Sequence, residues 1–263
     1  MLASRPWRQG PNLLKRPVDA RISSDLQHIE ETDTDAKARL ERAREVNLVY
    51  VSNMPNFVAD ETAKRYAGDG KSSRWRFMDT IETEVTFNGS RAVRRQIRRN
   101  GKAWDRPFDE LPGFKWSGGF GTELRPLFDP QCPTAIEYQG RAEARGKQTW
   151  VYRFTSPADG CFAEFFDQGS RDNPPRTGQV FLGDSDNRVI RFNEDAEGFP
   201  AGFAFAKREE QVWWDDVRIG NDSHLLPVGA SFVVFYASGN RYRVDVEYTH
   251  HRHFEASTSV TFQ

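Results

Sequence analysis

Apolar and polar residues alternate along most of the chain from Arg74 onward. The clearest run is Arg241-Tyr242-Arg243-Val244-Asp245-Val246-Glu247-Tyr248. A repeat of two is typical of a strand with one buried and one solvated face, because successive side chains of a strand point to opposite sides. Turns rich in Gly, Asn and Asp separate the runs. The pattern therefore predicts a mainly β protein.

The runs are numerous enough to predict about ten or eleven strands, joined mostly as successive hairpins in an antiparallel sheet. Such a sheet must close, or curl and cover its concave face, because exposed edges invite pairing with other chains. We therefore expect a strongly bent sheet or a half-open barrel. The expected strands cover residues 74–87, 90–99, 135–138, 148–154, 162–166, 179–182, 188–192, 204–218, 224–236, 241–254 and 257–262.

One stretch near the N-terminus has a helical period instead. Between Asp35 and Asn53 the residues of one face recur every three or four positions, which predicts an amphipathic helix over 35–53. Asp33 or Thr34 can cap its start, and Pro55 stops it. We expect this helix to cover an edge or the open mouth of the sheet.

The chain divides into two parts on this interpretation. Residues 1–33 mix Pro, Arg, Asp and Ser without a period, which predicts an extended or poorly ordered arm. Residues 34–263 are expected to form a single β-rich domain, with a loop and helix inserted near 105–130, where Pro and Gly are frequent.

Matching the apolar faces registers two hairpins. A three-residue loop near Gly89 sets Val85 opposite Val93. A three-residue loop, Ala144-Arg145-Gly146, sets Tyr138 opposite Tyr152 and Trp150 over Gly140.

The second register also brings Cys132 near Cys161. A disulfide at this position closes the hairpin and favours an oxidising compartment. Two buried free thiols are the alternative. The N-terminus lacks the apolar core of a signal peptide, so we expect the mature chain of an extracytoplasmic protein, periplasmic or associated with the cell envelope.

Composition narrows the partners. Lys and Arg total 37 against 38 Asp and Glu, a net charge of -1, so no global field would attract nucleic acid. No apolar run is long enough for an integral membrane span. The 20 Phe, 7 Trp and 7 Tyr indicate an apolar surface built from large flat side chains.

Three motifs fall in a specific order: Asn-Leu-Val-Tyr-Val-Ser-Asn-Met-Pro-Asn-Phe (47–57), Phe-Gly-Thr-Glu-Leu-Arg-Pro-Leu-Phe-Asp-Pro (120–130) and Gly-Gln-Val-Phe-Leu-Gly-Asp-Ser-Asp-Asn-Arg-Val-Ile-Arg-Phe (178–192). Over residues 35–262 this layout resembles a group of uncharacterised bacterial extracytoplasmic proteins related to outer-membrane lipoprotein-sorting carriers. The resemblance implies a bent sheet with a helix plugging its concave side, the cavity in which the carriers accept acyl chains. Gly183–Asn187 departs from the Asp-x-x-Thr-Gly turn of the relatives.

An inward aromatic face could line a greasy pocket, and Asp79 could anchor a polar group there. Packing of these residues against the helix is the alternative, with Asp79 at a bulge or rim. The candidate ligand-binding residues are Trp75, Phe77, Asp79, Phe87, Trp150, Tyr152, Phe154, Tyr242 and Tyr248.

Catalytic and metal motifs are missing from the sequence. The adjacent Glu209 and Glu210 point to opposite faces of a strand, so this pair does not converge on a substrate. His251 and His253 share a face, yet zinc needs at least a third ligand. We expect no enzyme, no cofactor and no metal site.

Two functions stay open. The first is an extracytoplasmic binding or carrier-like module for an apolar ligand such as a lipid or an acylated protein. The second is a ligand-free structural or protein-interaction domain of the cell envelope. An open apolar concavity favours the first, and a filled interior with an exposed aromatic patch favours the second.

Overall fold

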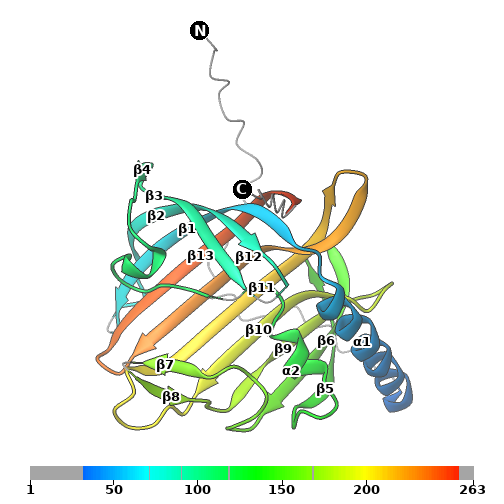
Figure 1. Ribbon diagram of the computed structural model, residues 1–263. Helices are drawn as coiled ribbons and strands as arrows, with labels where there is room; N and C mark the ends of the chain where they lie inside the picture. The colour runs from blue at the N-terminus through cyan, green and yellow to red at the C-terminus, as the bar shows by residue number, and fades with distance from the viewer. Residues whose placement is uncertain (1–31, 71, 90, 118, 168, 255–263) are drawn as a thin grey trace, which may run out of the picture.

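The computed structural model describes residues 32–70, 72–89, 91–117, 119–167 and 169–254 (Figure 1). Its main strands are β1 (Phe57–Asp69), β2 (Arg76–Phe87), β3 (Ala92–Arg99), β4 (Lys102–Ala103), β5 (Ala135–Ala144), β6 (Lys147–Ser156), β9 (Arg176–Gly183), β10 (Val189–Glu197), β11 (Phe205–Ile219), β12 (Asp222–Tyr236) and β13 (Asn240–His253). A separate hairpin pairs β7 (Phe165–Asp167) with β8 (Ser170–Asp172). The helices are α1 (Asp33–Asn53), the 3-10 helix η1 (Phe108–Glu110) and α2 (Leu124–Phe128).

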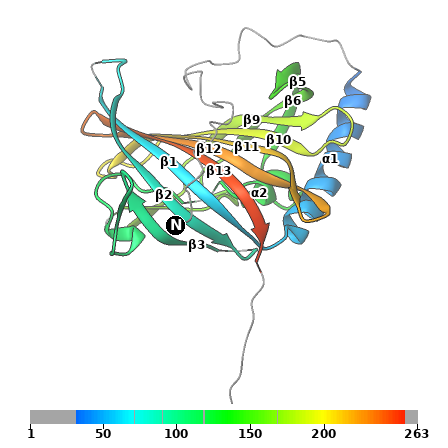
Figure 2. The ribbon, with the colours of Figure 1, turned by 90° about the horizontal axis from the view of Figure 1, so that it is seen from above.

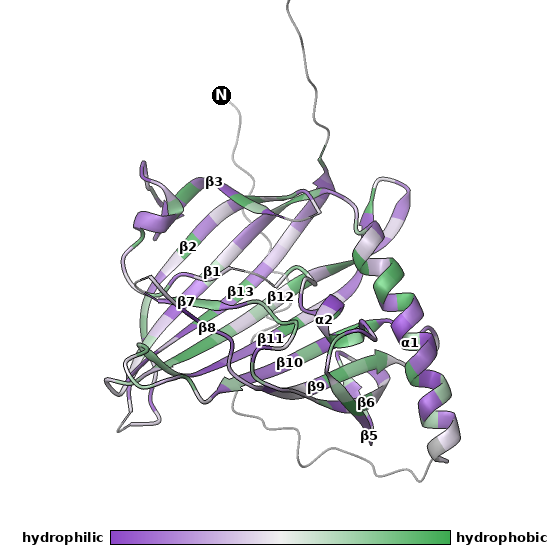
Figure 3. Ribbon diagram, turned by 60° about the horizontal axis from the view of Figure 1, so that its bottom comes forward, coloured by the Kyte–Doolittle hydropathy of each residue, from purple (hydrophilic) through white to green (hydrophobic). Residues whose placement is uncertain are grey.

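The main strands form one sheet of 11 strands in the order β4-β3-β2-β1-β13-β12-β11-β10-β9-β6-β5, and every pairing is antiparallel. The sheet curves but does not close, because β4 and β5 remain its two edges (Figure 2). Hydrophobic and hydrophilic positions alternate along the strands (Figure 3). The predicted half-open antiparallel architecture is confirmed. The predicted strand 257–262 and nearly all of the predicted arm lie outside the described residues.

The first strand, β1, is a long strand that the alternation did not predict, and the short strands β4 and β8 were not predicted either. Strand β1 pairs with β2 on one side and with β13 on the other, so it joins the beginning of the sheet to its end. Its inward positions include Glu61 and Arg65, which are 1% and 2% exposed. Buried charges at these positions break the apolar period, and the strand is invisible to a hydrophobic pattern for that reason.

The chain between β4 and β5 crosses from one edge of the sheet to the other, because these two strands are its opposite edges. Trp116, Phe120, Leu124 and Phe128 of this crossing segment are buried in the same core as the inward residues of the sheet. Leu40 and Ala43 of α1 belong to this core too. The helix and the crossing segment therefore each cover part of the inner face.

Helix α1 begins at Asp33, two residues before the predicted start at Asp35. Thr32 is the N-cap, with an extended backbone, and its side chain accepts a hydrogen bond from the Asp35 amide at 3.3 Å. Asn47 pins the helix to the sheet, because its amide donates to the Asn187 carbonyl at 2.9 Å and accepts from the Val189 amide at 3.0 Å. The Tyr152 hydroxyl donates to the Ala36 carbonyl at 3.0 Å.

The register predicted for the hairpin of β2 and β3 is wrong by one residue. Phe87 pairs with Ala92, so the loop is 88–91, and Val85 lies opposite Arg94 instead of Val93. Arg94 turns inward because its partner there is the buried Glu61, with Nε to Oε2 at 2.6 Å. An ion pair inside the sheet thus replaces the apolar pair that the pattern favoured.

The second hairpin register is half right. Tyr138 pairs with Tyr152 as predicted, but a register shift between Tyr138 and Gly140 then sets Trp150 opposite Arg141. The shift absorbs one residue, and the loop is only Arg145-Gly146, both with positive φ. The predicted strand 162–166 is also corrected, since only Phe165–Asp167 is a strand and it pairs with β8 outside the main sheet.

Candidate ligand-binding site

A concavity of about 630 Å³ opens on the inner face of the sheet. Its sides are the crossing segment, over residues 114–126, and the segment 161–166 before and within β7. Its floor comes from β9, β10, β11 and β12. The hairpin of β7 and β8 lies over this part of the sheet, in front of it in Figure 1.

Aromatic side chains form much of the wall, among them Phe114, Phe162, Phe165 and Phe205. Phe162 stacks on Phe154 with ring centroids 5.9 Å apart, which ties the wall to the core below. Phe166 at the mouth is 62% exposed. The concavity therefore offers apolar surface that side chains of the protein do not fill.

The floor is charged, which is unusual for a buried surface. Arg176 of β9, Glu194 of β10 and Glu210 of β11 are 2%, 5% and 3% exposed. Arg208 lies two positions before Glu210 and therefore on the same face of β11. Glu194 and Glu210 pair directly across β10 and β11, a like-charge juxtaposition that destabilises a sheet.

Two ion pairs connect these groups. The Arg208 Nη2 atom donates to Glu210 Oε2 at 2.7 Å, and Arg176 Nε lies 3.4 Å from Glu194 Oε1. Arg176 Nη2 also donates to the Ala163 carbonyl at 2.9 Å. Phe165 lies over both cations, with its ring centroid 4.2 Å from the guanidinium carbon of Arg176 and 5.0 Å from that of Arg208.

Several polar atoms of the floor and side remain without a hydrogen-bond partner among the described residues. They are Arg176 Nε and Nη1, Glu210 Oε1 and Glu123 Oε2, the last contributed by the crossing segment just before α2. A buried polar atom left unpaired costs about 1–3 kcal/mol, and more when it is charged. Buried unpaired charges that line a concavity mark a site that a ligand can complete.

Burial governs the protonation of this cluster. It raises the pKa of Glu210 to about 8, because the attraction of Arg208 is offset by the nearby Glu123 and Glu194 carboxylates. Burial likewise raises the pKa of Glu194 and lowers that of Arg176. At neutral pH the cluster thus holds a proton that an exposed set of carboxylates would release.

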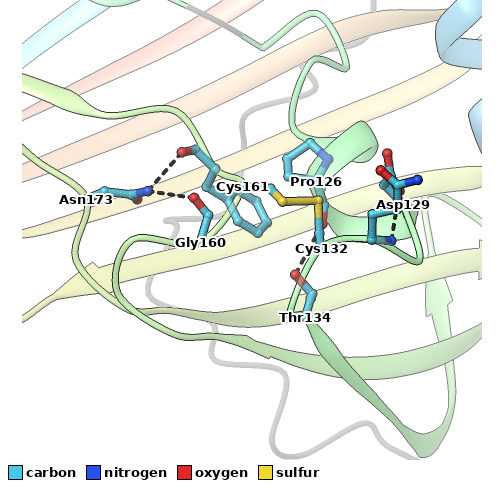
Figure 4. The surroundings of a disulfide bond; sticks show 9 residues. Pro126, Asp129, Cys132, Thr134, Gly160, Cys161 and Asn173 are labelled. Carbon is cyan, nitrogen blue, oxygen red and sulfur yellow. Dashed lines mark hydrogen bonds between the residues drawn. A yellow bond between two sulfur atoms is a disulfide. The ribbon is translucent and has the colours of Figure 1, made fainter.

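A disulfide fixes one side of the concavity. Cys132 and Cys161 are bonded, with Cα atoms 5.6 Å apart, which confirms the predicted bridge (Figure 4). The bond ties the segment before β7 to the chain just before β5. The side-chain amide of Asn173 donates to the Gly160 and Phe162 carbonyls at 2.9 and 3.1 Å, so it holds the segment on both sides of Cys161.

A second set of buried charges is fully paired and holds the crossing segment on the sheet. Glu61 accepts from both Arg94 and the Trp116 indole, the latter at 2.7 Å. Arg65 makes a bidentate pair with Asp79, both distances 2.7 Å, and donates to the Pro112 and Phe114 carbonyls. These contacts anchor the segment that forms one side of the concavity.

The residues predicted to bind a ligand fall in three places. Phe87, Tyr152, Phe154 and Tyr248 are buried core residues. Trp150 lies between the cations of Arg39 and Arg141, at 3.4 and 4.2 Å from its ring centroid. Trp75, Phe77 and Tyr242 lie at the end of the sheet where β2 and β13 begin, and Phe77 is 52% exposed.

Asp79 is buried beside a register shift between β1 and β2, where it pairs with Arg65 and Arg99. None of the predicted ligand-binding residues lines the concavity of about 630 Å³, so their role in binding stays a prediction. The charged floor was missed, although the sequence carries a signal for it. Glu210 is in phase with the apolar Val212 and Trp214, and Glu194 is in phase with Phe192.

His251 and His253 were expected to share a face of their strand, but they contact different residues. The Nε2 atom of His251 lies 2.9 Å from the Pro227 carbonyl oxygen, whereas His253 meets Asp222 and His224, with one ligand atom of each within 4.8 Å of the others. In the turn before β10, Asp186 accepts from the Arg188 side chain and Asp184 pairs with Arg141. Within the described residues, no helix is both long and apolar enough to cross a membrane.

No protein-family model matches this chain. No curated protein matches it either. Two solved structures do. A DUF1329 family protein from Desulfovibrio piger is 11% identical with a TM-score of 0.38, and a LolA superfamily protein from Nitrosomonas europaea is 9% identical with a TM-score of 0.29.

Each match covers 84% of this chain and 94% of the solved one. At these TM-scores neither structure carries an argument about the function of this chain.

Proposed function

We propose that the protein is a carrier-like binding module of the cell envelope whose ligand is apolar over most of its length, such as a lipid or an acylated protein. The observation that carries the proposal is the inner-face concavity of about 630 Å³ with its aromatic walls. Each methylene buried there contributes about 0.8 kcal/mol, so a medium-length acyl chain supplies enough free energy for binding.

The proposal extends to the compartment. A disulfide between Cys132 and Cys161 persists in an oxidising environment, which favours an extracytoplasmic and most simply a periplasmic location. Fractionation of the native host tests this location. Recovery of the protein with both thiols reduced in the cytosolic fraction would contradict it.

Extraction of the purified protein tests the carrier function. The protein is denatured, its organic extract is examined by mass spectrometry, and lipid in near-stoichiometric amount is the expected result. Ala163→Trp places an indole in the concavity and should empty it, whereas Ala201→Trp, at an exposed loop position, should leave the lipid content unchanged. Equal lipid in both variants, or none in the unaltered protein, argues against the proposal.

A ligand-free interaction domain is the second candidate function. It is favoured by two exposed aromatic side chains, Phe77 and Phe166, which are 52% and 62% exposed. An extract without lipid, together with a complex that is lost in Phe77→Ser or Phe166→Ser, is the outcome that selects this candidate over the carrier.

A further inference from the structure

The buried and half-buried charged groups of the concavity do not balance, once its exposed Lys115, Arg125 and Glu164 are set aside. Three buried or half-buried carboxylates, Glu123, Glu194 and Glu210, meet two guanidiniums, Arg176 and Arg208. The mutual influence of these groups is direct, since Glu123 and Glu194 both act on the protonation of Glu210. With every group ionised, the site is one positive charge short.

The other cations of the concavity do not fill this deficit. Lys115 and Arg125 line its outer part, where both are exposed to solvent. Lys115 donates to the Leu111 carbonyl at 3.3 Å, and Arg125 donates to the Ser52 hydroxyl at 3.2 Å. Solvent screens these two charges. They therefore neutralise the carboxylates of the floor far less than a cation bound next to those carboxylates would.

The site that lacks one positive charge also contains carboxylate oxygens that accept no hydrogen bond. Glu210 Oε1 and Glu123 Oε2 accept no hydrogen bond from the described residues, although both atoms are buried. A carboxylate desolvated in this way either takes up a proton or finds a cation. Phe165 and Phe162 line the same concavity and give it an aromatic wall.

We propose that the ligand carries a protonated amine at its polar end, which pairs with Glu210 and Glu123 while the apolar chain lies along the aromatic wall. The inference rests on the carrier function proposed above. An ammonium group is compact, donates three hydrogen bonds and brings a single positive charge. A divalent metal ion fits less well, because Arg176 and Arg208 belong to the same cluster and repel it.

Two kinds of molecule supply such a group: a lipid with an ethanolamine headgroup, and an acylated peptide with a free amino terminus. Arg176 Nη1, which lacks a partner among the described residues, is available to donate to an acceptor oxygen next to the amine. A phosphate in the first case or a peptide carbonyl in the second would use it. The shared chemistry is the amine.

Matched amphiphiles test the inference by calorimetry. Decylamine, decanol and decanoate share one chain length and differ in the polar group. We expect decylamine to bind at least about tenfold more tightly than either of the others. Equal affinities overturn the amine inference and leave the carrier function standing, whereas no binding of any of the three argues against the carrier function itself.

Variants of the carboxylates show which residues cause the preference for decylamine. Glu210→Gln should bring the affinity for decylamine to within about twofold of that for decanol, and Glu123→Gln should weaken decylamine in the same direction. Glu164→Gln is the matched control, because Glu164 lines the same concavity but its side chain is 48% exposed. Decylamine binding that survives both Glu210→Gln and Glu123→Gln in folded protein overturns the inference.

Proton release separates pairing with Glu210 from a structural effect of the substitution. Because burial raises the pKa of Glu210 to about 8, pairing with an ammonium at pH 7 should displace a proton from this carboxyl, and about one proton should leave per amine bound. Calorimetry in buffers of different ionisation enthalpy measures this number. Decanol should release none, and an amine that releases none contradicts the proposed pairing.

The two sources are then compared directly. A short-chain ethanolamine lysophospholipid and a cysteinyl dipeptide amide that carries an alkyl chain on its sulfur through a thioether are each tested beside their N-acetylated forms. Loss of binding on acetylation supports the amine as the recognised group and shows which source the site accepts. Unchanged binding after acetylation of both overturns the inference.

Discussion

Two sets of buried charges occupy the inner face of the sheet, and they differ in one respect. The anchors Glu61 and Arg65, with their partners on β2 and β3, have their charges matched and bonded. The cluster around Glu194 and Glu210 has like charges opposed across two strands and atoms without partners. The first set therefore stabilises the fold. The second set is a site whose unpaired atoms a ligand can bind.

The largest expected effect comes from breaking an anchor. Glu61→Ala strands the buried Arg94 cation and removes the acceptor of the Trp116 indole, so we expect a loss of about 3–5 kcal/mol in the free energy of unfolding. Urea denaturation measures it. Glu82→Ala, at an exposed position of β2, should change the stability by less than about 0.5 kcal/mol. Similar losses of stability in the two variants would contradict the claim that Glu61 anchors the fold and Glu82 does not.

Removal of the disulfide should come next. Cys132 and Cys161 are separated by 29 positions, and closing a loop of this length stabilises the folded state by about 3–4 kcal/mol. The variant with both residues changed to Ala should show that loss in urea denaturation. Reductant should lower the midpoint of the unaltered protein and leave the variant unchanged, and an effect of reductant on the variant would point to another cause.

The smallest effect has the opposite sign and concerns pH. The pKa of Glu210 is raised from 4.5 to about 8, so the folded protein binds a proton that the unfolded chain releases within this range. Stability contributed by this group is full below about pH 4.5 and is lost as the pH rises toward 8. As the pH rises from 5 to 9, Glu210→Gln should gain at least about 2 kcal/mol of stability relative to the unaltered protein, since each pKa unit corresponds to about 1.4 kcal/mol.

The matched control for this prediction is Glu209→Gln. Glu209 is the sequence neighbour on the opposite face of β11, and it pairs with Lys207 at 3.1 Å. Its substitution should leave the pH dependence unchanged. A difference between Glu210→Gln and the unaltered protein that stays constant across the range would show that Glu210 does not hold the proton.

The same contrast explains what the sequence could predict. Strands whose inward positions are apolar, such as β13, follow from alternation alone, and the Tyr138–Tyr152 pairing and the disulfide follow from matched faces. Strand β1 was missed because Glu61 and Arg65 interrupt its inward face. A repeat of two can be recognised only where the inward side chains of a strand are apolar, so it is lost where ion pairs are buried.

The charged floor of the concavity was not predicted from the sequence for a related reason. Glu209 and Glu210 were rightly expected to point to opposite faces, but the neighbour that matters is Glu194, which lies opposite Glu210 on another strand. Cross-strand neighbours depend on register, and a single bulge, such as the shift after Tyr138, moves every pair beyond it. Local pattern fixes the face of a residue but not its partner across the sheet.

The protonation of Glu210 tests the central claim most directly. Its carboxyl carbon is followed by NMR through a pH titration, with the signal assigned by its absence in Glu210→Gln. We predict a midpoint near 8 in the free protein and a clear fall when decylamine is bound. A midpoint near the ordinary 4.5 in the free protein, or one that decylamine leaves unmoved, would contradict the account.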